Sequence, residues 1–261
     1  MTIWHCVKLR VWNLRKCANN VRIGKGALGS VSKMSIYVTG DIHGYPIRFD
    51  QPNLEAMGLK LAENDKVIIC GDFGLPWYGD KEDESCLNWL EAKPFEILFI
   101  DGNHENFDLL YQFPIEERYG GKVRKFRENI FHLMRGEVYE IEGKKYFAFG
   151  GATSADKYTR EEGVSWWKEE THSQEEYENA LKNLGKVDFK VDYVATHTVP
   201  IRFLENVDFN KQDAKSCPVA IMLEDLVKRL HYRKWFAGHF HVDYVDEKNN
   251  VAWVYEEIKK L

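Results

Sequence analysis

The sequence lacks any uninterrupted apolar run of the ~18–20 residues that a membrane-spanning helix requires. Only four residues make up each of its clearest apolar runs, 67–70 and 97–100, which are typical of buried strands. The chain also lacks a disordered or low-complexity composition, because 44% of its 261 residues are hydrophobic and 30% are charged. These absences exclude a membrane span and leave a globular protein long enough for one sizeable core.

Paired cysteines are missing as well. The five cysteines are odd in number and show neither a Cys-x-x-Cys motif nor a repeated spacing. The N-terminal region has no hydrophobic segment of the kind that directs secretion. We therefore expect free thiols and a protein of the reducing cytoplasm.

Acidic residues are absent from residues 1–33, which contain seven Lys or Arg. Residues 34–261 hold 29 basic and 41 acidic side chains, so this part is acidic although the whole chain has a net charge of only −5. An acidic body disfavours binding to nucleic acid or to an anionic membrane, because both are negatively charged. We therefore expect a small-molecule partner and no membrane. Nucleic acid is an alternative that we do not favour, and the oligomeric state stays open.

Three explanations of the basic segment 1–33 compete. It is an arm that contacts nucleic acid, a transit-type leader, which would also be rich in Arg and poor in acid, or an upstream extension of the reading frame with Met34 as the natural start. We favour the last explanation, because the first cluster of chemically useful residues begins only seven residues after Met34. We expect residues 1–33 to be a non-native or disordered extension and residues 34–261 to form the functional domain.

Strand-like and helical patterns alternate along the rest of the chain. The expected strands are residues 36–39, 66–70, 97–100, 145–149, 193–196, 234–237, 242–245 and 251–255. Helices are expected at residues 173–184, where Ser173 and Glu176 match a capping box, and at residues 219–230, where apolar residues share one face. Strands alternating with helices indicate a layered α/β domain. Residues 122–150 have several strand-like pieces and no strong helix, which predicts an antiparallel insertion within the same sheets.

Five polar clusters follow predicted strands. They are Gly40-Asp41-Ile42-His43-Gly44, Gly71-Asp72-Phe73-Gly74, Gly102-Asn103-His104-Glu105, His197, and Gly238-His239-Phe240-His241. Residues two apart in an extended chain project to the same side, so Asp41 and His43 can bind one ion. A strand-end Asp often caps a helix and a lone His is often structural, but five of the nine histidines fall at strand ends. Because α/β proteins build their sites at the carboxyl ends of strands, we expect one shared site.

The order of these clusters resembles the calcineurin-like metallophosphoesterase superfamily. All five blocks, GD-x-H-G, GD-x-x-G, GNHE, H and GH-x-H, occur in the family's order between residues 40 and 241. The resemblance implies an α/β sandwich of four layers, α-β-β-α, with a dinuclear metal site at the carboxyl ends of the strands. It also implies a metal-dependent hydrolase of phosphate esters in which a hydroxide held between two ions attacks the phosphorus.

The resemblance implies a role for each residue of the motifs. One metal would be bound by Asp41, His43, Asp72 and His241, and the other by Asp72, Asn103, His197 and His239, with Asp72 as the bridge. His104 would bind no metal and would act as the catalytic residue that contacts the substrate phosphate or the leaving-group oxygen. Imidazole and amide ligands beside only two carboxylates suit transition metals better than Ca²⁺ or Mg²⁺. We therefore expect two divalent transition-metal ions, Mn²⁺ first, with Fe, Zn, Co or Ni as alternatives.

The sequence departs from the protein-phosphatase branch of that superfamily. That branch continues its second and third blocks with Asp and Arg, where this sequence has Leu75, Pro76, Trp77 and Phe107. Two arginines that would bind phosphate through paired hydrogen bonds are therefore missing, and so is the Asp that would orient His104. We do not expect phosphoprotein hydrolysis in the manner of that branch.

Two further residues are candidates for substrate binding. Trp77 follows the second block, where its ring would stack on a nucleobase or an aryl group; packing beneath a loop is an equal alternative. Arg160 or Lys157, in a loop rich in Gly and small polar residues, would replace the missing arginines. We interpret Trp166 and Trp167 in the same stretch as core aromatics.

We expect a phosphoesterase that acts on a small phosphomonoester, a phosphodiester or a nucleotide. The second candidate is a nuclease or a cyclic-nucleotide phosphodiesterase, and a protein phosphatase ranks third. Outside the enzymes, the alternative is a catalytically silent binding scaffold of the same fold. We disfavour the scaffold because every expected ligand and His104 are present.

Overall fold

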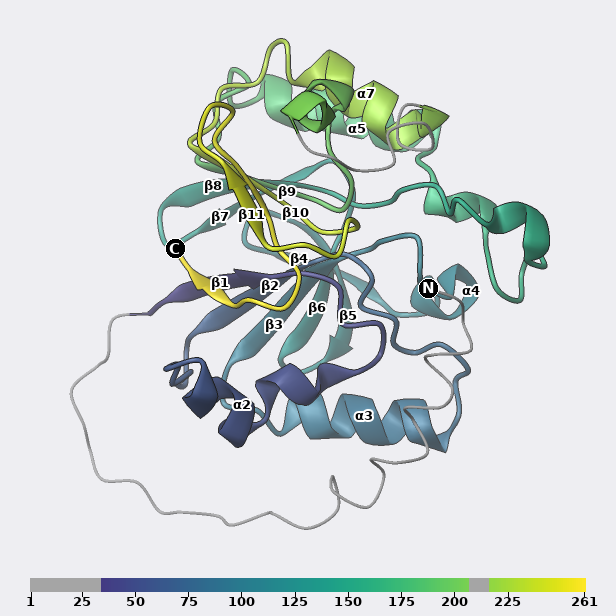
Figure 1. The fold of residues 1–261 in the computed structure, drawn as a ribbon, viewed down its shortest axis with the longest axis vertical. Helices are drawn as coiled ribbons and strands as arrows, with labels where there is room; N and C mark the ends of the chain where they lie inside the picture. The colour runs from purple at the N-terminus through teal and green to yellow at the C-terminus, as the bar shows by residue number, and fades with distance from the viewer. Residues whose placement is uncertain (1–33, 207–215) are drawn as a thin grey trace. The chain divides into compact units, whose positions relative to one another are not determined.

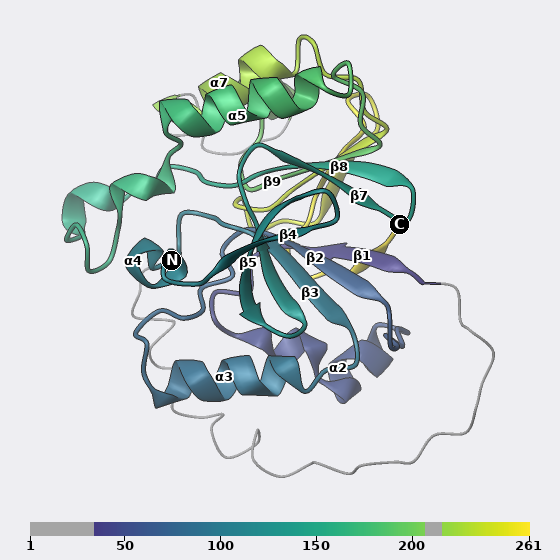
Figure 2. The same cartoon turned by 180° about the vertical axis from the view of Figure 1, so that it is seen from behind.

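The strands of the protein form two sheets that face each other. The computed structural model describes residues 34–206 and 216–261, and Figures 1 and 2 show them from opposite sides. The expected extension at residues 1–33 lies outside the described residues. Its status, and the domain boundary after it, stay predictions.

One sheet has seven strands in the order β13-β1-β2-β3-β6-β5-β4. Their bounds are β1 Ile36–Thr39, β2 Lys66–Cys70, β3 Glu96–Ile100, β4 Ile115–Arg118, β5 Gly121–Arg127, β6 Ile130–Leu133 and β13 Lys259–Lys260. Strands β1, β2, β3 and β6 pair in parallel, whereas β4, β5 and β13 pair antiparallel with their neighbours. The carboxyl ends of β1, β2 and β3 therefore lie at the same end of this sheet.

The other sheet has six strands in the order β11-β12-β10-β9-β8-β7. Their bounds are β7 Glu137–Ile141, β8 Lys144–Phe149, β9 Tyr193–Thr196, β10 Lys234–Ala237, β11 Tyr244–Asp246 and β12 Val251–Trp253. Strands β8, β9, β10 and β12 pair in parallel, and β7 and β11 are antiparallel strands at the two edges. The carboxyl ends of β9 and β10 therefore also lie side by side.

Helices cover the outer faces of both sheets. The α-helices are α2 Gln51–Ala56, α3 Lys81–Glu91, α4 Phe107–Leu110, α5 Gln174–Gly185 and α7 Pro218–Leu226. Figure 1 shows α2 and α3 against the seven-stranded sheet and α5 and α7 against the six-stranded sheet. This arrangement confirms the predicted four-layer α-β-β-α sandwich. None of the helices in the described ranges combines the length and the apolarity needed to cross a membrane.

The alternation of side chains along the strands explains how three apolar cores separate the four layers. In β2, Val67 and Ile69 pack toward α2 and α3, whereas Ile68 and Cys70 face the other sheet. The same alternation divides the apolar residues of β9, β10 and β12 between the helices and the space between the sheets. Because successive residues of a strand point to opposite faces, strands buried on both faces must be continuously apolar. The short apolar runs of the sequence are therefore sandwich strands.

Most expected elements agree with the structure, and three differ. The strand expected at residues 251–255 ends at Trp253, because the backbone groups of Tyr255 bind the side chains of Asp243 and Arg48 instead of a neighbouring strand. The strand expected at 242–245 begins only at Tyr244. The helix expected to reach residue 230 ends at Leu226. Beyond it, the backbone N–H groups of Lys228 and Arg229 donate to carbonyl oxygens three residues earlier, as in a turn.

The expected insertion at residues 122–150 is also more divided than predicted. It forms two antiparallel pairs, β5 with β6 and β7 with β8, and each pair joins a different sheet. The sequence showed only strand pattern here, and pattern does not say which sheet a strand joins. Strand β4, which the analysis of the sequence did not predict, pairs with β5 at the edge of the seven-stranded sheet.

Candidate metal centre

Five strand ends bring the predicted site residues together. Asp41, Asp72 and Asn103 lie just beyond β1, β2 and β3, and His197 and His239 lie just beyond β9 and β10. Each group of strands is parallel, so its carboxyl ends converge. Contacts between His197 and both aspartates join the two groups across the sandwich.

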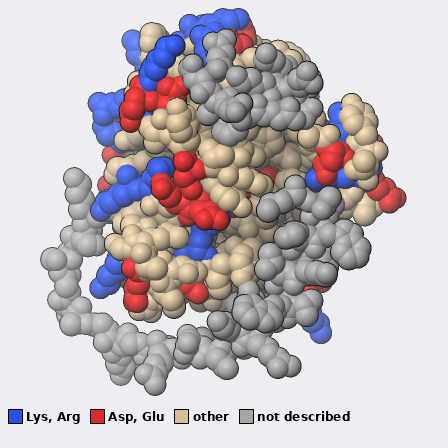
Figure 3. Space-filling view, in the orientation of Figure 1, with Lys and Arg blue, Asp and Glu red and all other residues tan. Residues whose placement is uncertain are grey.

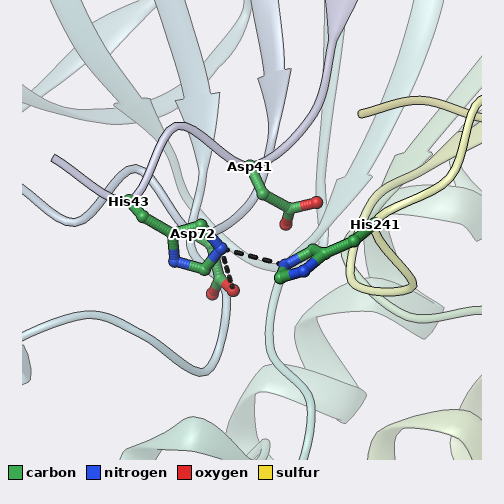
Figure 4. Close-up of side chains that lie close together, drawn as sticks. All are labelled: Asp41, His43, Asp72 and His241. Carbon is green, nitrogen blue, oxygen red and sulfur yellow. Dashed lines mark hydrogen bonds and ion pairs between the residues drawn. The ribbon is translucent and has the colours of Figure 1, made fainter. Parts of the chain in front are cut away.

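The first group of side chains consists of Asp41, His43, Asp72 and His241 (Figure 4). Each residue offers one ligand atom, and these atoms all lie within 4.8 Å of one another. Nε2 of His43 lies 2.9 Å from Nε2 of His241 and 3.8 Å from Oδ2 of Asp72. We call this group site A. Its two aspartates are buried, whereas His241 is exposed.

The second group, which we call site B, consists of Asp72, Asn103, His197 and His239. Nε2 of His197 lies 3.2 Å from Oδ1 of Asp72 and 3.1 Å from Oδ1 of Asn103. The ring of His239 packs edge-to-face on that of His197, with centroids 4.9 Å apart. Asp72 thus contacts residues of both sites, with one carboxylate oxygen toward each.

When its ring is neutral, His197 leaves site B with acceptors and no hydrogen between them. Nδ1 of His197 lies 2.9 Å from the carbonyl oxygen of Cys70, and a carbonyl only accepts, so the neutral ring carries its hydrogen on Nδ1. The amide nitrogen of Asn103 donates to Oγ of Ser154 at 3.1 Å, which turns its oxygen toward His197. Three lone-pair atoms, from Asp72, Asn103 and His197, therefore face one another. A buried arrangement of this kind requires a cation.

The electrostatics of the site point the same way. Although burial opposes the charged form, Asp72 and Asp41 raise the pKa of His197 to about 10, so a proton is held where a metal ion would lie. Burial lowers the pKa of His239 to about 3 and that of His241 to about 4, so these rings are neutral and offer lone pairs. Neutral imidazoles, carboxylates and one amide oxygen form a donor set that fits divalent transition metals.

The two carboxylates have different environments. Burial raises the pKa of Asp41 to about 6, although His197 opposes that shift. Burial would also raise the pKa of Asp72, but the nearby His197 and His104 hold it well below its ordinary value. Asp72 also accepts a hydrogen bond at 2.8 Å from the backbone N–H of His104. Asp72, which contacts residues of both sites, therefore stays ionised.

The backbone of the motifs is held in an uncommon conformation. His43, Asp72, His239 and His241 all have positive φ angles, of 47°, 49°, 70° and 52°. Such angles cost free energy for residues other than glycine, and they cluster at functional sites. The flanking glycines have a different reason: a Cβ on Gly71 would lie 2.1 Å from Nδ1 of His197. The glycines of the motifs are therefore needed for close packing around the candidate ligands.

His104 lies beside the site and contacts Arg160. Nη1 of Arg160 is 3.3 Å from Nδ1 of His104, and a guanidinium only donates, so Nδ1 accepts and Nε2 carries the hydrogen. Burial lowers the pKa of His104 to about 4, which also favours the neutral ring. Asp156 holds Arg160 through an ion pair at 2.8 Å, and the Arg160 side chain is only 6% exposed. An arginine therefore contacts His104 where the protein-phosphatase branch would place an aspartate.

Trp77 contacts an aromatic residue outside the two sites. Its ring packs edge-to-face on Trp167, with centroids 5.6 Å apart, and it is half-buried. Trp167 is 3% exposed and donates from Nε1 to Asp108, whereas Trp166 is half-buried. Trp167 and Arg160 belong to the same segment, between β8 and α5. The role of Trp77 in substrate binding stays a prediction.

Glu105 is a site-forming residue that the analysis of the sequence quoted but did not assign. Its buried carboxylate accepts the backbone N–H groups of Phe73 at 2.8 Å, Gly74 at 2.9 Å and Gly102 at 3.3 Å. It thereby ties the loop after β3 to the loop that carries Asp72. Its place as the last residue of the GNHE block was the feature of the sequence that could have identified it. The analysis of the sequence also gave no role to Arg48, Ser154 and Tyr255, which contact site residues but lie in none of the five motif blocks.

The comparisons with known proteins agree with this geometry. The sequence matches the calcineurin-like phosphoesterase family over residues 34–243. A search of curated proteins finds no match. Among solved structures, the chain is similar to a phosphopantetheinyl hydrolase from Mycobacterium tuberculosis, with 12% identity, a TM-score of 0.44, and coverage of 87% of this chain and 95% of that one.

It is also similar to a protein described as a 5'-nucleotidase from Staphylococcus aureus, with 15% identity and a TM-score of 0.44. That alignment covers 85% of this chain and 48% of the other, so this chain spans about half the length of that protein. The family match covers most of the described residues and all five motif blocks. The chain therefore belongs to the calcineurin-like phosphoesterase family.

Proposed function

We propose that this protein is a phosphoric ester hydrolase that uses two divalent transition-metal ions, Mn²⁺ in the first place, to hydrolyse small phosphate esters or nucleotides. One observation carries the proposal: Oδ1 of Asp72 and Oδ1 of Asn103 both face Nε2 of the buried His197, at a point where only a proton or a metal ion balances them. Site A adds a second set of converging ligand atoms on the other side of Asp72. Asp41, His43, Asp72 and His241 would hold one ion, and Asp72, Asn103, His197 and His239 the other.

The chain's own residues have distinct tasks in this proposal. When bound, the two ions would lower the pKa of a water and polarise the phosphoryl oxygens. His104, with its hydrogen on Nε2, donates a hydrogen bond to an oxygen of the substrate. Arg160 holds His104 in that tautomer.

The substrate class follows from what surrounds the site. Leu75, Pro76 and Trp77 stand where the protein-phosphatase pattern has Asp, Arg and Gly, so one bidentate clamp on a dianionic phosphate is absent. That loss weakens binding of a monoester more than binding of a diester, which carries less charge. On the face drawn in Figure 3, basic and acidic side chains of the described residues lie beside each other. We therefore favour nucleotides and small esters over nucleic acid, with the cytoplasm as the location because the buried Cys70 and Cys217 form no disulfide bond.

The second candidate is a phosphodiesterase acting on cyclic nucleotides or nucleic acid. The missing arginine clamp favours it, for the reason just given. A protein phosphatase is third, because that activity depends on the clamp. A silent scaffold of the same fold would have no use for the neutral His104 and its buried arginine.

A panel of substrates on metal-depleted and reconstituted protein tests the proposal. Chelation should abolish hydrolysis, and Mn²⁺ should restore it better than Ca²⁺. Aryl diesters and nucleotides should be hydrolysed at least as well as simple monoesters, and phosphopeptides poorly. Trp77→Ala should raise KM for nucleotides and aryl esters more than for alkyl phosphates. Full activity after exhaustive chelation, with no metal found by elemental analysis, would refute the metal assignment.

A further inference from the structure

His241 is the most exposed of the residues assigned to the two sites. It lies in the loop between β10 and β11, on the other side of site A from His43 (Figure 4). Its backbone has a positive φ of 52°, which a non-glycine residue adopts only at a cost in free energy. An exposed ligand on a strained loop needs neighbours that hold it in place.

Tyr255 supplies one such neighbour. Its ring stacks on the imidazole of His241, with centroids 4.7 Å apart and an angle of 17° between the planes. Tyr255 lies just beyond β12 and outside the residues 34–243 that match the family. The contact therefore belongs to a part of this chain that the family comparison does not describe.

Asp243 fixes the loop of His241 to the segment that carries Tyr255. Its carboxylate accepts the backbone N–H groups of three consecutive residues, Tyr255 at 2.9 Å, Glu256 at 3.0 Å and Glu257 at 3.2 Å. Hydrogen bonds to an ionised carboxylate are among the stronger ones in proteins. The loop and the segment thus move together.

Arg48 connects the same segment to the other half of site A. Its guanidinium donates to the carbonyl oxygens of Tyr255, Gly40 and Asp41, the last at 2.8 Å. It also donates to Oγ1 of Thr39 at 2.7 Å. Arg48 therefore ties Tyr255 to the backbone of Asp41, a ligand from the opposite sheet.

We infer that Tyr255 is a positioning residue for His241, and that Asp243 and Arg48 hold Tyr255 so that site A keeps its geometry. This inference rests on the proposed function, because it assigns His241 to a metal ion. An imidazole that is free to rotate presents its lone pair to the ion only part of the time. A stacked ring limits that rotation, and outer partners of metal ligands are worth ~10–100-fold in affinity. Stacking needs the ring of Tyr255 and not its hydroxyl.

Metal titration of the full chain tests the inference, with Mn²⁺ alone as the probe. Wild type should bind two ions by calorimetry and by elemental analysis. Tyr255→Leu, which keeps an apolar side chain without a ring, should bind one ion as wild type does and the other ~10–100-fold more weakly. Tyr255→Phe should restore both affinities. Tyr244→Leu is the matched control, since Tyr244 is a partly exposed aromatic near the same sheet edge whose ring packs on Trp253.

Electron paramagnetic resonance adds a readout that general destabilisation does not reproduce. Two Mn²⁺ ions that share a bridging ligand give a coupled spectrum, so Tyr255→Leu at limiting Mn²⁺ should give the spectrum of isolated ions. Asp243→Asn, at an exposed position, should weaken the same ion and serves if Tyr255→Leu does not fold.

The possible failures are distinguishable. Wild type that binds no metal and hydrolyses no ester would refute the proposed function. Wild type that binds two ions, with Tyr255→Leu or a folded Asp243→Asn binding both as tightly, would overturn the inference alone. Equal losses in Tyr255→Phe and Tyr255→Leu would also overturn it, because the stacked ring would then not be the cause.

Discussion

His104 combines three contacts that define its task at the scale of a single residue. Its backbone N–H binds Asp72, its Nδ1 accepts from Arg160, and its ring packs against that of His43, with centroids 5.3 Å apart. The remaining nitrogen, Nε2, carries a hydrogen. We therefore expect His104 to donate to a substrate oxygen rather than to bind metal.

The variant His104→Ala should keep both metal ions and lose kcat by ~10²–10³-fold, the usual cost of removing one donor to a developing charge. Elemental analysis gives the metal content, and steady-state kinetics give kcat. His231→Ala, at an exposed histidine outside the site, is the control and should behave as wild type. Loss of metal from His104→Ala would show that the division between ligand and donor is wrong.

Gly71 shows how a residue without a side chain shapes the site. Its φ is +90°, and an added Cβ would meet Nδ1 of His197 at 2.1 Å. Gly120 has a similar φ of +78°, but an added Cβ would meet nothing within 4 Å. A comparison of alanine variants at the two positions therefore distinguishes the cost of backbone strain from the cost of steric overlap.

Gly120→Ala should lower the free energy of unfolding by ~1–2 kcal/mol, the cost of a left-handed conformation. Gly71→Ala should cost ~1–3 kcal/mol more, because His197 must also move, and it should weaken metal binding. Urea unfolding and metal titration provide the measurements. Equal destabilisation of the two variants would mean that the site tolerates the added methyl group.

At the scale of an element, helix α5 begins with a complete capping box. Oγ of Ser173 accepts the N–H of Glu176 at 3.2 Å, and the carboxylate of Glu176 accepts the N–H of Ser173 at 2.7 Å. The buried residues Ala180 and Leu184 on the same helix pack in the core against the six-stranded sheet. The cap thus determines where this covering helix starts.

Ser173→Ala should lower the free energy of unfolding by ~1 kcal/mol and leave metal binding unchanged. Ser85→Ala is the matched control, since Ser85 is exposed within α3 and caps no helix. Its effect should stay within ~0.5 kcal/mol. Thermal and urea unfolding measure both. A Ser173 variant as stable as the Ser85 control would show that the cap contributes little.

At the scale of the whole described structure, one buried carboxylate joins several elements. Asp101 follows β3 and accepts from Nε2 of His132 on β6 at 2.9 Å and from Nε of Arg135 at 2.8 Å. Arg135 in turn donates to the carbonyl oxygens of Glu169 and Thr171. Both members of the Asp101–Arg135 pair are buried. The segment that carries Arg160 is therefore anchored to the seven-stranded sheet by a charge pair.

The Asp101–Arg135 pair makes the free energy of unfolding depend on pH, and the direction of that dependence follows from the pKa of Asp101. Although burial opposes ionisation, Arg135 and His132 lower the pKa of Asp101 below its ordinary value of 3.8. A carboxyl with a lowered folded pKa contributes stability that is fully present above its unfolded pKa of about 4, and that is lost as the pH falls below it. Asp101→Asn should lower the free energy of unfolding by ~3–5 kcal/mol near neutral pH, because it leaves a buried arginine unpaired.

Between pH 6 and pH 3, the difference between wild type and Asp101→Asn should stay constant down to about pH 5 and then shrink, because the unfolded wild-type chain binds a proton there that the folded state does not bind. Urea unfolding across that range measures it. Asp188→Asn makes the same substitution at an exposed position and should change stability by no more than ~0.5 kcal/mol. A difference that is constant with pH would contradict the assignment of this charge pair.

The family resemblance and the alternation of strands and helices could be predicted from the sequence. The strands depend on local pattern, because strands buried on both faces are short apolar runs, and polar residues follow those runs at fixed spacings. Asp41 and His43 could be grouped from such spacing alone, whereas the role of Asp72 was implied by the resemblance. The end of β12 was less predictable, because the side chains of Asp243 and Arg48 bind the backbone of Tyr255.

Tertiary structure alone decided which residues support the ligands. Arg48 and Tyr255, like Arg160 and His104, meet across long stretches of chain, and no periodicity of the sequence connects them. Their pairing depends on where loops return after the sheets have packed. Only the folded structure therefore shows that an arginine contacts His104 and that a tyrosine stacks on His241.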